Sequence, residues 1–214
     1  MTQTMPNKTS SEMLGLMKFF GETERLKSEL RHSFLSDGRQ ESVAEHTWMM
    51  SLMAVVMTTR LNVSVDLLKV LKMIIIHDIA EVIIGDIPSF EDSERQNRKQ
   101  ADEYKAMQKL LSKLPKALEV EFFEVWNEYE AGASVESKFA RALDHIEVQH
   151  QHNLAPFSTW EAFETDLVYT KMDDRAEFDS SIVEFVAAVR SQAEELMMKN
   201  DIDVTELRQR HNVS

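Results

Sequence analysis

One stretch of sequence decides the fold: Ile74-Ile-Ile-His77-Asp78-Ile-Ala-Glu81-Val-Ile-Ile-Gly85-Asp86. Its four titratable residues interrupt an otherwise apolar run. Burying such groups without partners is unfavourable, and the cost is greatest for an isolated carboxylate. A divalent cation bound by these side chains would offset that cost. The stretch therefore predicts a metal site on a helix that packs into the interior.

Helical spacing supports this interpretation. His77 and Glu81 are four residues apart and Asp78 and Glu81 three apart, so all three project toward one side of a helix. His77 and Asp78 diverge by roughly 100° on a helix of about 3.6 residues per turn, and an ion at that edge can still reach both. A bare His-Asp pair is more often a core histidine beside a salt-bridged aspartate. With Glu81 and Asp86 in the same run, the sequence favours a metal site and a purely structural His-Asp pair about equally.

Capping signals predict helices on both sides of this stretch. Ser42-Val-Ala-Glu45 has the form of a capping box, and Ser64 can cap a helix whose apolar residues recur at helical spacing. Gly85 follows at the position expected for a left-handed stop residue. We expect helices over residues 43–61, 65–82, 94–114 and 115–132, from Ser134 through Asp144, after a second capping box at residues 158–161, and over residues 180–199.

The composition favours helices throughout. Only five glycines and four prolines occur in 214 residues, and the chain has no internal repeat or low-complexity linker. We predict an all-α fold, a single globular helical bundle over residues 11–200. Residues 1–10 are expected to be a flexible N-terminus and residues 201–214 a frayed polar tail.

Composition also excludes several classes of function. The chain has no cysteine, which rules out a thiolate nucleophile, a cysteine zinc site and an iron–sulfur cluster. Its formal net charge of −13 argues against a nucleic-acid-binding protein. The sequence has no apolar run of about 18 residues that could span a membrane, and residues 1–11 lack the order of a signal peptide. We therefore expect a cytoplasmic protein without nucleic-acid or membrane partners.

Two further residues extend the candidate metal site. His46 lies in the first turn after the capping box, and Asp144 lies in the mostly apolar stretch Phe139-Ala-Arg-Ala-Leu-Asp144. Taken alone, a first-turn histidine is usually solvated, and an aspartate in such a stretch is usually an ion-pair partner, here of Arg141. Their order along the chain favours a different interpretation.

The order His46, His77-Asp78, Asp144 resembles the H…HD…D signature of the HD-domain metal-dependent phosphohydrolases. The blocks that surround these residues, over about residues 26–150, resemble the branch that contains the 5′-deoxynucleotidases. The resemblance implies that His46, His77, Asp78 and Asp144 bind one divalent transition-metal ion. Two imidazoles and two carboxylates suit Mn, Fe, Co, Ni or Zn, with Mg as a further option.

The resemblance also implies roles for three other residues. Glu81 and Asp86 occupy the positions that handle the attacking water and the leaving nucleoside oxygen, and Arg31 occupies that of a substrate-contacting arginine. The relatives usually follow that arginine with tryptophan, whereas this chain has His32, which bears on the preference for base and sugar. The implied reaction is removal of the 5′-phosphate of (deoxy)ribonucleoside monophosphates by metal-activated water.

Two alternatives are left open by the sequence. One is a phosphodiesterase or guanosine-tetraphosphate hydrolase on the same scaffold, although the latter usually carries a second acid where this chain has Val82. The other is a non-catalytic domain that binds metal and nucleotide. Members of this branch commonly form homodimers, and the methionines near Met49 and Met53 would allow one. The basic residues Arg95, Arg98 and Lys99 are more readily interpreted as a solvated helix face than as a phosphate contact.

Overall fold

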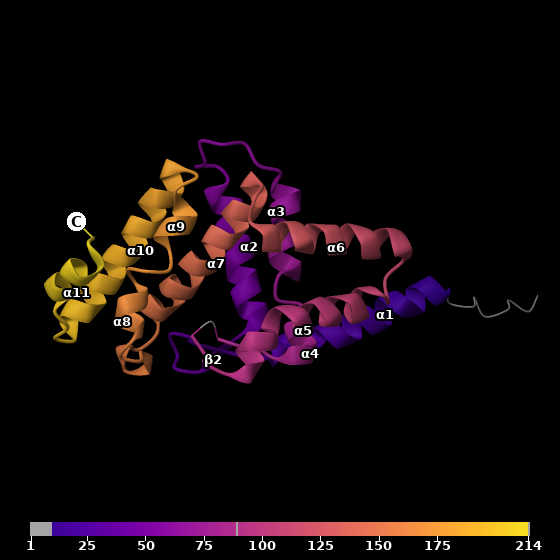
Figure 1. The fold of residues 1–214 in the computed structure, drawn as a ribbon, viewed down its shortest axis with the longest axis horizontal. Coiled ribbons are helices and arrows are strands. Elements are labelled where there is room, and N and C mark those ends of the chain that lie inside the picture. Colours follow the sequence, from indigo (N-terminus) through magenta and orange to yellow (C-terminus); the bar gives the residue numbers. More distant parts are fainter. Residues whose placement is uncertain (1–9, 89, 214) are drawn as a thin grey trace, which may run out of the picture.

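The computed structural model describes residues 10–88 and 90–213. The predicted flexible N-terminus therefore lies outside the described residues, except for Ser10, which caps the first helix. Figure 1 shows an elongated arrangement of helices with α1 and α11 at opposite ends. The first half contains α1 (Ser11–Thr23), the 3-10 helix η1 (Glu24–Lys27), strands β1 (Leu30–Phe34) and β2 (Gln40–Ser42), α2 (Val43–Met57), α3 (Leu67–Ile76), α4 (Glu81–Ile84) and α5 (Glu94–Leu111).

The second half is helical in every regular element. It contains α6 (Lys116–Ala131), α7 (Val135–Leu154), the 3-10 helix η2 (Phe157–Thr159), α8 (Glu164–Leu167), α9 (Asp173–Ala176), α10 (Ser180–Lys199) and α11 (Val204–His211). The all-α prediction is confirmed. No helix among the described residues is both long and apolar enough to cross a bilayer.

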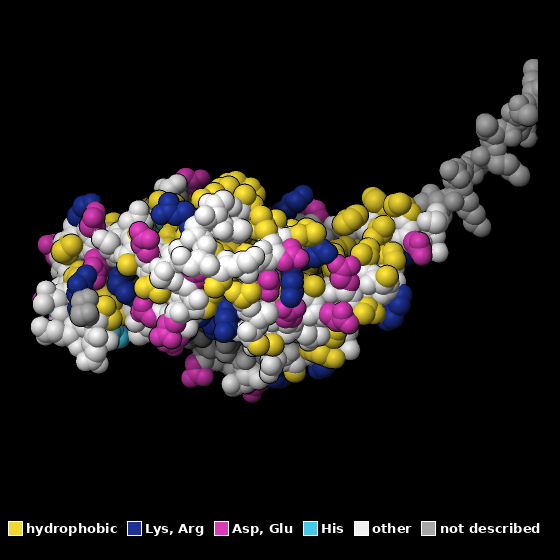
Figure 2. All heavy atoms as spheres, turned by 90° about the horizontal axis from the view of Figure 1, so that it is seen from above, with side chains coloured by type: hydrophobic (Ala, Val, Ile, Leu, Met, Phe, Trp, Pro, Cys, Tyr) yellow, Lys and Arg dark blue, Asp and Glu magenta, His cyan; other side chains and the backbone are white. Residues whose placement is uncertain are grey.

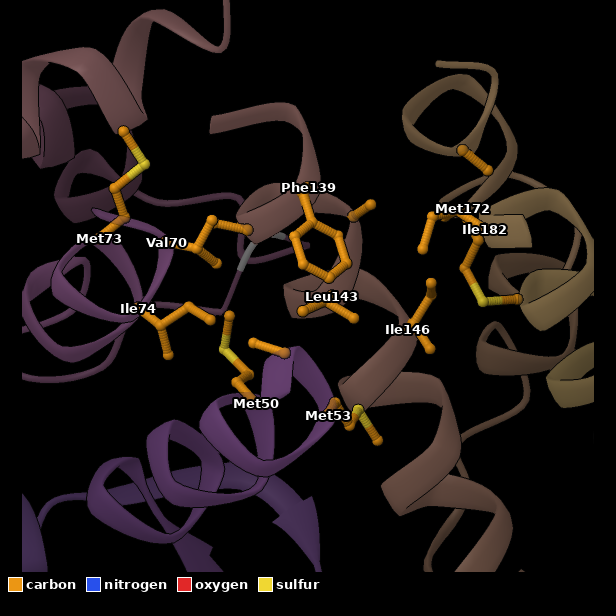
Figure 3. Packing of buried hydrophobic residues seen from close by; sticks show 14 of the residues in the cluster. Met50, Met53, Val70, Met73, Ile74, Phe139, Leu143, Ile146, Met172 and Ile182 are labelled. Carbon is orange, nitrogen blue, oxygen red and sulfur yellow. The ribbon is translucent and has the colours of Figure 1, made fainter. Parts of the chain in front are cut away.

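Helix α7 is the centre of the molecule. It packs against α2, α3, α6 and α10, and Figure 1 shows it crossing between α2 and α10. Phe139, Leu143 and Ile146 of α7 are fully buried where these helices meet. Figure 3 shows their neighbours in this core, which come from α2, α3 and the C-terminal half: Met50, Met53, Val70, Met73, Ile74, Met172 and Ile182. Met50 and Met53, two of the methionines that could have formed an interface, thus pack in the core.

A short antiparallel hairpin precedes α2. Strands β1 and β2 pair Leu30 with Ser42 and Phe34 with Gln40, with an irregular register in between. The capping box at Ser42 then begins α2 directly: Ser42 accepts a hydrogen bond from the Glu45 backbone, and the Glu45 carboxylate accepts one from the Ser42 N–H. The hairpin therefore fixes the side chains on both strands relative to the first turn of α2.

The predicted helix over residues 65–82 is wrong in its extent. Asp66 rather than Ser64 caps α3, and α3 ends at Ile76. The N–H groups of Ile79, Glu81 and Val82 each bond to the carbonyl three residues earlier, so the backbone tightens before α4 begins. Two further boundaries also differ, since α2 ends at Met57 and α5 at Leu111.

Two expectations for the C-terminal third differ from the structure. Residues 157–159 form a 3-10 turn, and Ser158 caps no α-helix. Residues 204–211 form α11 where a frayed tail was expected, because Asp203 caps the helix and Leu207 packs into a small core with Val168 and Met197. The polar sequence of this helix concealed it, since Leu207 is its one buried residue and its other contacts include ion pairs such as that of Arg208 with Glu194.

Candidate metal centre and active site

Three separate elements contribute the predicted metal ligands. His46 lies in the first turn of α2, His77 directly follows α3, and Asp144 lies in the middle of α7. The structure brings one donor atom from each of these three within 4.8 Å of one another. The His46 Nε2 atom lies 3.3 Å from Asp144 Oδ1, and the His77 Nε2 atom lies 3.0 Å from Asp78 Oδ2. All four predicted ligands are therefore neighbours.

The protonation pattern of the imidazoles suits a metal. His77 donates its Nδ1–H to the carbonyl of Ile74 at 2.6 Å, and His46 Nδ1 lies 2.5 Å from the Glu147 carboxylate. A histidine that donates through Nδ1 presents the lone pair of Nε2. Both Nε2 atoms are buried, and although each lies near an aspartate oxygen, neither makes a hydrogen bond of normal geometry among the described residues. A divalent cation would satisfy both, so the donor set fits one.

The remaining predicted residues line one cavity of about 200 Å³. Arg31, Glu81 and Asp86 lie in its wall together with Asp78 and Asp144. Arg31 comes from β1, and its Nη1 lies 3.3 Å from Asp78 Oδ2. The cavity therefore combines a guanidinium with a group of carboxylates next to the candidate metal centre.

The cavity continues to an end lined by ring side chains. His32 lies edge-on to Phe90, with ring centroids 4.9 Å apart. The buried Glu164 carboxylate contacts His32 Nε2 at 3.1 Å and His152 Nδ1 at 3.4 Å. Burial, and after it the nearby charge of His32 and Arg31, lowers the pKa of His152 to about 4. His32, which stands where the relatives usually have tryptophan, is thus held in place by the carboxylate of Glu164.

Four residues of the site escaped the sequence analysis. Tyr129 donates its hydroxyl to Asp144 Oδ2 at 3.1 Å. Lys99, interpreted as part of a solvated face, lies in the cavity wall instead. Glu41 and Glu147 are buried behind His46. The spacing of Asp144 and Glu147, three residues apart on α7, was the one available signal for Glu147, because it places both acids toward the same side of the helix.

A comparison with protein families identifies the fold. The HD domain matches residues 23–184. The chain belongs to the HD-domain family. Among curated relatives, bovine 5′-deoxynucleotidase HDDC2 is 30% identical over 145 residues, which cover 68% of each chain. The human protein of the same name is 35% identical over 111 residues, covering 51% of this chain and 52% of that one.

A solved structure resembles this HD domain along most of its length. It is the crystal structure of a predicted metal-dependent phosphohydrolase from Magnetospirillum magnetotacticum, with a TM-score of 0.72 and 25% identity. The match covers 92% of this chain and 99% of the other. The similarity therefore includes helices beyond residue 150, where the sequence resemblance fades.

Burial is the main cause of the raised pKa values of Glu81 and Glu41 in this HD domain. Burial and the charges of Asp78 and Asp86 together raise the pKa of Glu81 to about 10, while Arg31 opposes them. Burial likewise raises the pKa of Glu41 to about 7, together with the charge of Glu147. Without a cation, the folded protein therefore favours the protonated form of both glutamates.

This electrostatic pattern predicts how the stability of the metal-free protein depends on pH. An acid with a raised folded-state pKa binds its proton more tightly in the folded state, so its stabilisation is lost as the pH rises through that pKa. With chelator present, the free energy of unfolding should fall as the pH rises from about 4.5, the ordinary pKa of a glutamate, to about 10, that of Glu81 in the folded protein. Glu81→Gln should reduce this slope, measured by chemical denaturation. An unchanged slope in that variant would contradict the assignment of Glu81.

Proposed function

We propose that this chain is a metal-dependent phosphohydrolase that removes the 5′-phosphate of deoxyribonucleoside monophosphates. The observation that carries the proposal is the pair of buried Nε2 atoms of His46 and His77 beside Asp78 and Asp144, at the wall of a cavity that also contains Arg31. Curated relatives from cattle, humans and mice are 5′-deoxynucleotidases by name. Those names support the nucleotide as substrate.

The proposed metal ligands are His46, His77, Asp78 and Asp144. Two imidazoles and two carboxylates suit a first-row divalent ion such as Mn, Fe, Co, Ni or Zn. When bound, the ion supplies Lewis acidity, which lowers the pKa of a water molecule and polarises a phosphate oxygen. Three protein groups around it are proposed to act on the substrate.

Arg31 is proposed to bind the phosphate. Its guanidinium is held at the ligand cluster by Asp78 and by Glu41, which lies 3.5 Å from its Nε. A planar guanidinium can donate two parallel hydrogen bonds to phosphate, which a lysine cannot. Lys99 in the same wall adds positive charge on the side of α5. The two cations give an acidic protein a local site for an anion.

Glu81 and Asp86 are proposed to move protons. Both line the cavity next to the ligand cluster. Glu81 would accept the proton of the attacking water. A divalent cation held by Asp78 and Asp144 would lower the raised pKa of Glu81 toward the range in which it can ionise. Burial raises the pKa of Asp86, Arg31 opposes this, and the charge of Asp78 adds to it. A raised pKa suits a group that donates a proton to the departing 5′ oxygen.

The end of the cavity lined by His32 and Phe90 is proposed to hold the nucleoside. Ring side chains offer flat apolar surface, and His32 and Gln149 add polar atoms. The cavity lies beside the ligand cluster, so a phosphate at Arg31 could extend a nucleoside into this end. This arrangement favours a mononucleotide over a polymeric substrate.

Phosphate release from a panel of nucleotides tests the proposal. Metal-free protein reloaded with Mn, Co, Ni, Zn or Mg should release phosphate from deoxyribonucleoside 5′-monophosphates. Glu81→Gln should lower kcat by about 10²- to 10⁴-fold, because it removes the group that accepts the proton. Glu195→Gln, an exposed change on α10, is the matched control. Turnover of cyclic nucleotides or guanosine tetraphosphate alone would contradict the proposal, as would metal binding with no turnover.

We propose that a second copy of the chain is a partner. Helix α2 exposes Trp48, Leu52 and Val55 at helical spacing, and α1 exposes Met17 and Phe20. Figure 2 shows hydrophobic side chains gathered toward the end of the molecule where α1 lies. Exposed apolar surface of this kind commonly marks an interface.

Analytical sedimentation tests whether two copies of the chain form a dimer. The chain should sediment as a dimer, and Trp48→Glu should shift it to a monomer because a charge would be buried in the interface. Glu184→Gln, an exposed change on α10, should leave the dimer intact. A monomer at all concentrations would contradict the proposal.

A further inference from the structure

Two buried carboxylates lie behind the proposed metal ligands. Glu41 of β2 is 1% exposed, and Glu147 of α7 is fully buried. One oxygen of each, together with a ring nitrogen of His46, lies within a group whose atoms are all within 4.8 Å of one another. Two buried acids of like charge this close repel each other when both are ionised, so stability alone gives no reason for the pair.

Glu147 contacts His46 on the side away from the proposed metal. Its Oε2 lies 2.5 Å from His46 Nδ1, and this contact fixes both the ring orientation and the tautomer. His77 differs, because its Nδ1–H is held by a backbone carbonyl of its own helix, that of Ile74. A change of side chain cannot remove that carbonyl, whereas it can remove Glu147. The orientation of His46 therefore depends on a side chain from another helix.

Glu41 contacts the guanidinium of Arg31. Its Oε2 lies 3.5 Å from Arg31 Nε, and the Arg31 side chain is 13% exposed. On its opposite side, Glu41 belongs to the same close group as His46 and Glu147. Glu41 thus lies between Arg31, which is proposed to bind phosphate, and Glu147, which contacts His46. Arg31 and Glu41 lie on β1 and β2, so the hairpin sets their separation.

Hydrogen bonding within the described residues leaves part of this pair unsatisfied. Glu147 Oε1 is buried without a hydrogen-bond partner there, and Glu41 Oε2 has only the 3.5 Å ion-pair contact with Arg31 Nε. A buried acceptor without a partner is unfavourable, and more so when it is charged. That cost is understandable if the carboxylates hold other groups in a functional geometry, as at many metal sites.

We propose that Glu147 and Glu41 form one positioning unit, in which Glu147 holds the His46 ring with Nε2 toward the metal and Glu41 holds Arg31 beside Asp78. The inference rests on the proposed function for its metal ligands and phosphate site. Neither glutamate is proposed to touch the substrate. Each acts through the residue that it contacts, so the two should affect different binding steps.

Titration of the metal-free full-length protein with Co²⁺ tests the first half. The readouts are the dissociation constant and the visible absorption of the bound ion. Glu147→Ala should weaken Co²⁺ binding by about 10- to 100-fold and change the spectrum. Glu147→Gln should recover most of the affinity, because its amide oxygen can still accept from His46 Nδ1. Glu194→Gln, which removes a buried carboxylate bound to Tyr169 and Arg208, is the control and should bind as the unaltered protein does.

Inorganic phosphate binding to the Co²⁺-loaded protein tests the second half. Glu41→Gln should weaken phosphate binding by about 10-fold, which corresponds to about 1.4 kcal/mol, while Co²⁺ affinity stays within about 2-fold of the unaltered protein. Co²⁺ affinity in Glu147→Ala and Glu147→Gln equal to that of the Glu194→Gln control would overturn the role of Glu147. Unchanged phosphate affinity in Glu41→Gln would overturn that of Glu41.

These measurements separate the inference from the proposed function. Both use binding of Co²⁺ or inorganic phosphate and need no turnover of nucleotide. If the two variants behave as expected but deoxynucleotides are not hydrolysed, the positioning unit stands and the nucleotidase proposal fails. If Co²⁺ binds the unaltered protein at residues other than His46, both the proposed metal site and the proposed positioning unit are wrong.

Discussion

Burial of ionisable side chains where α2, α3 and α7 meet is the constraint on which the rest of the structure depends. His46, His77 and Glu147 are buried at this junction, a few residues from the fully apolar contacts of Met50, Ile74 and Leu143. Charged groups in such a place require partners, since their hydration is lost. Each helix of the junction contributes one part of the polar cluster, and its apolar residues hold that part in place.

The local sequence accounts for much of this arrangement. The Ser42 capping box begins α2 and thereby sets His46 in its first turn, and the apolar spacing of residues 67–76 predicts the buried face of α3. The left-handed Gly132 ends α6 as expected. The all-α fold and the HD-domain family followed from the residues and from their resemblance. These features depend on contacts within a few residues, which is why sequence patterns reveal them.

Features that depend on distant residues were not predicted. The tight turns between α3 and α4 were not predicted, because the helical spacing of the apolar residues favoured one helix across them. The β1–β2 hairpin is too short to show a clear alternation, and α11 relies on contacts of Leu207 with residues far away in sequence. Glu147 was missed because its partner, His46, is 101 residues away. The roles of the ligands, of Glu81, Asp86 and Arg31 stay predictions.

The proposed metal ion lies between His46, His77, Asp78 and Asp144. Anomalous diffraction from crystals of the Co²⁺-loaded protein, recorded at the cobalt absorption edge, would locate it. We expect one strong peak per chain, within bonding distance of the Nε2 atoms of both histidines and of a carboxylate oxygen of each aspartate. A peak centred on Glu41 and Glu147 instead, or no peak at the cluster in fully loaded crystals, would contradict this proposal.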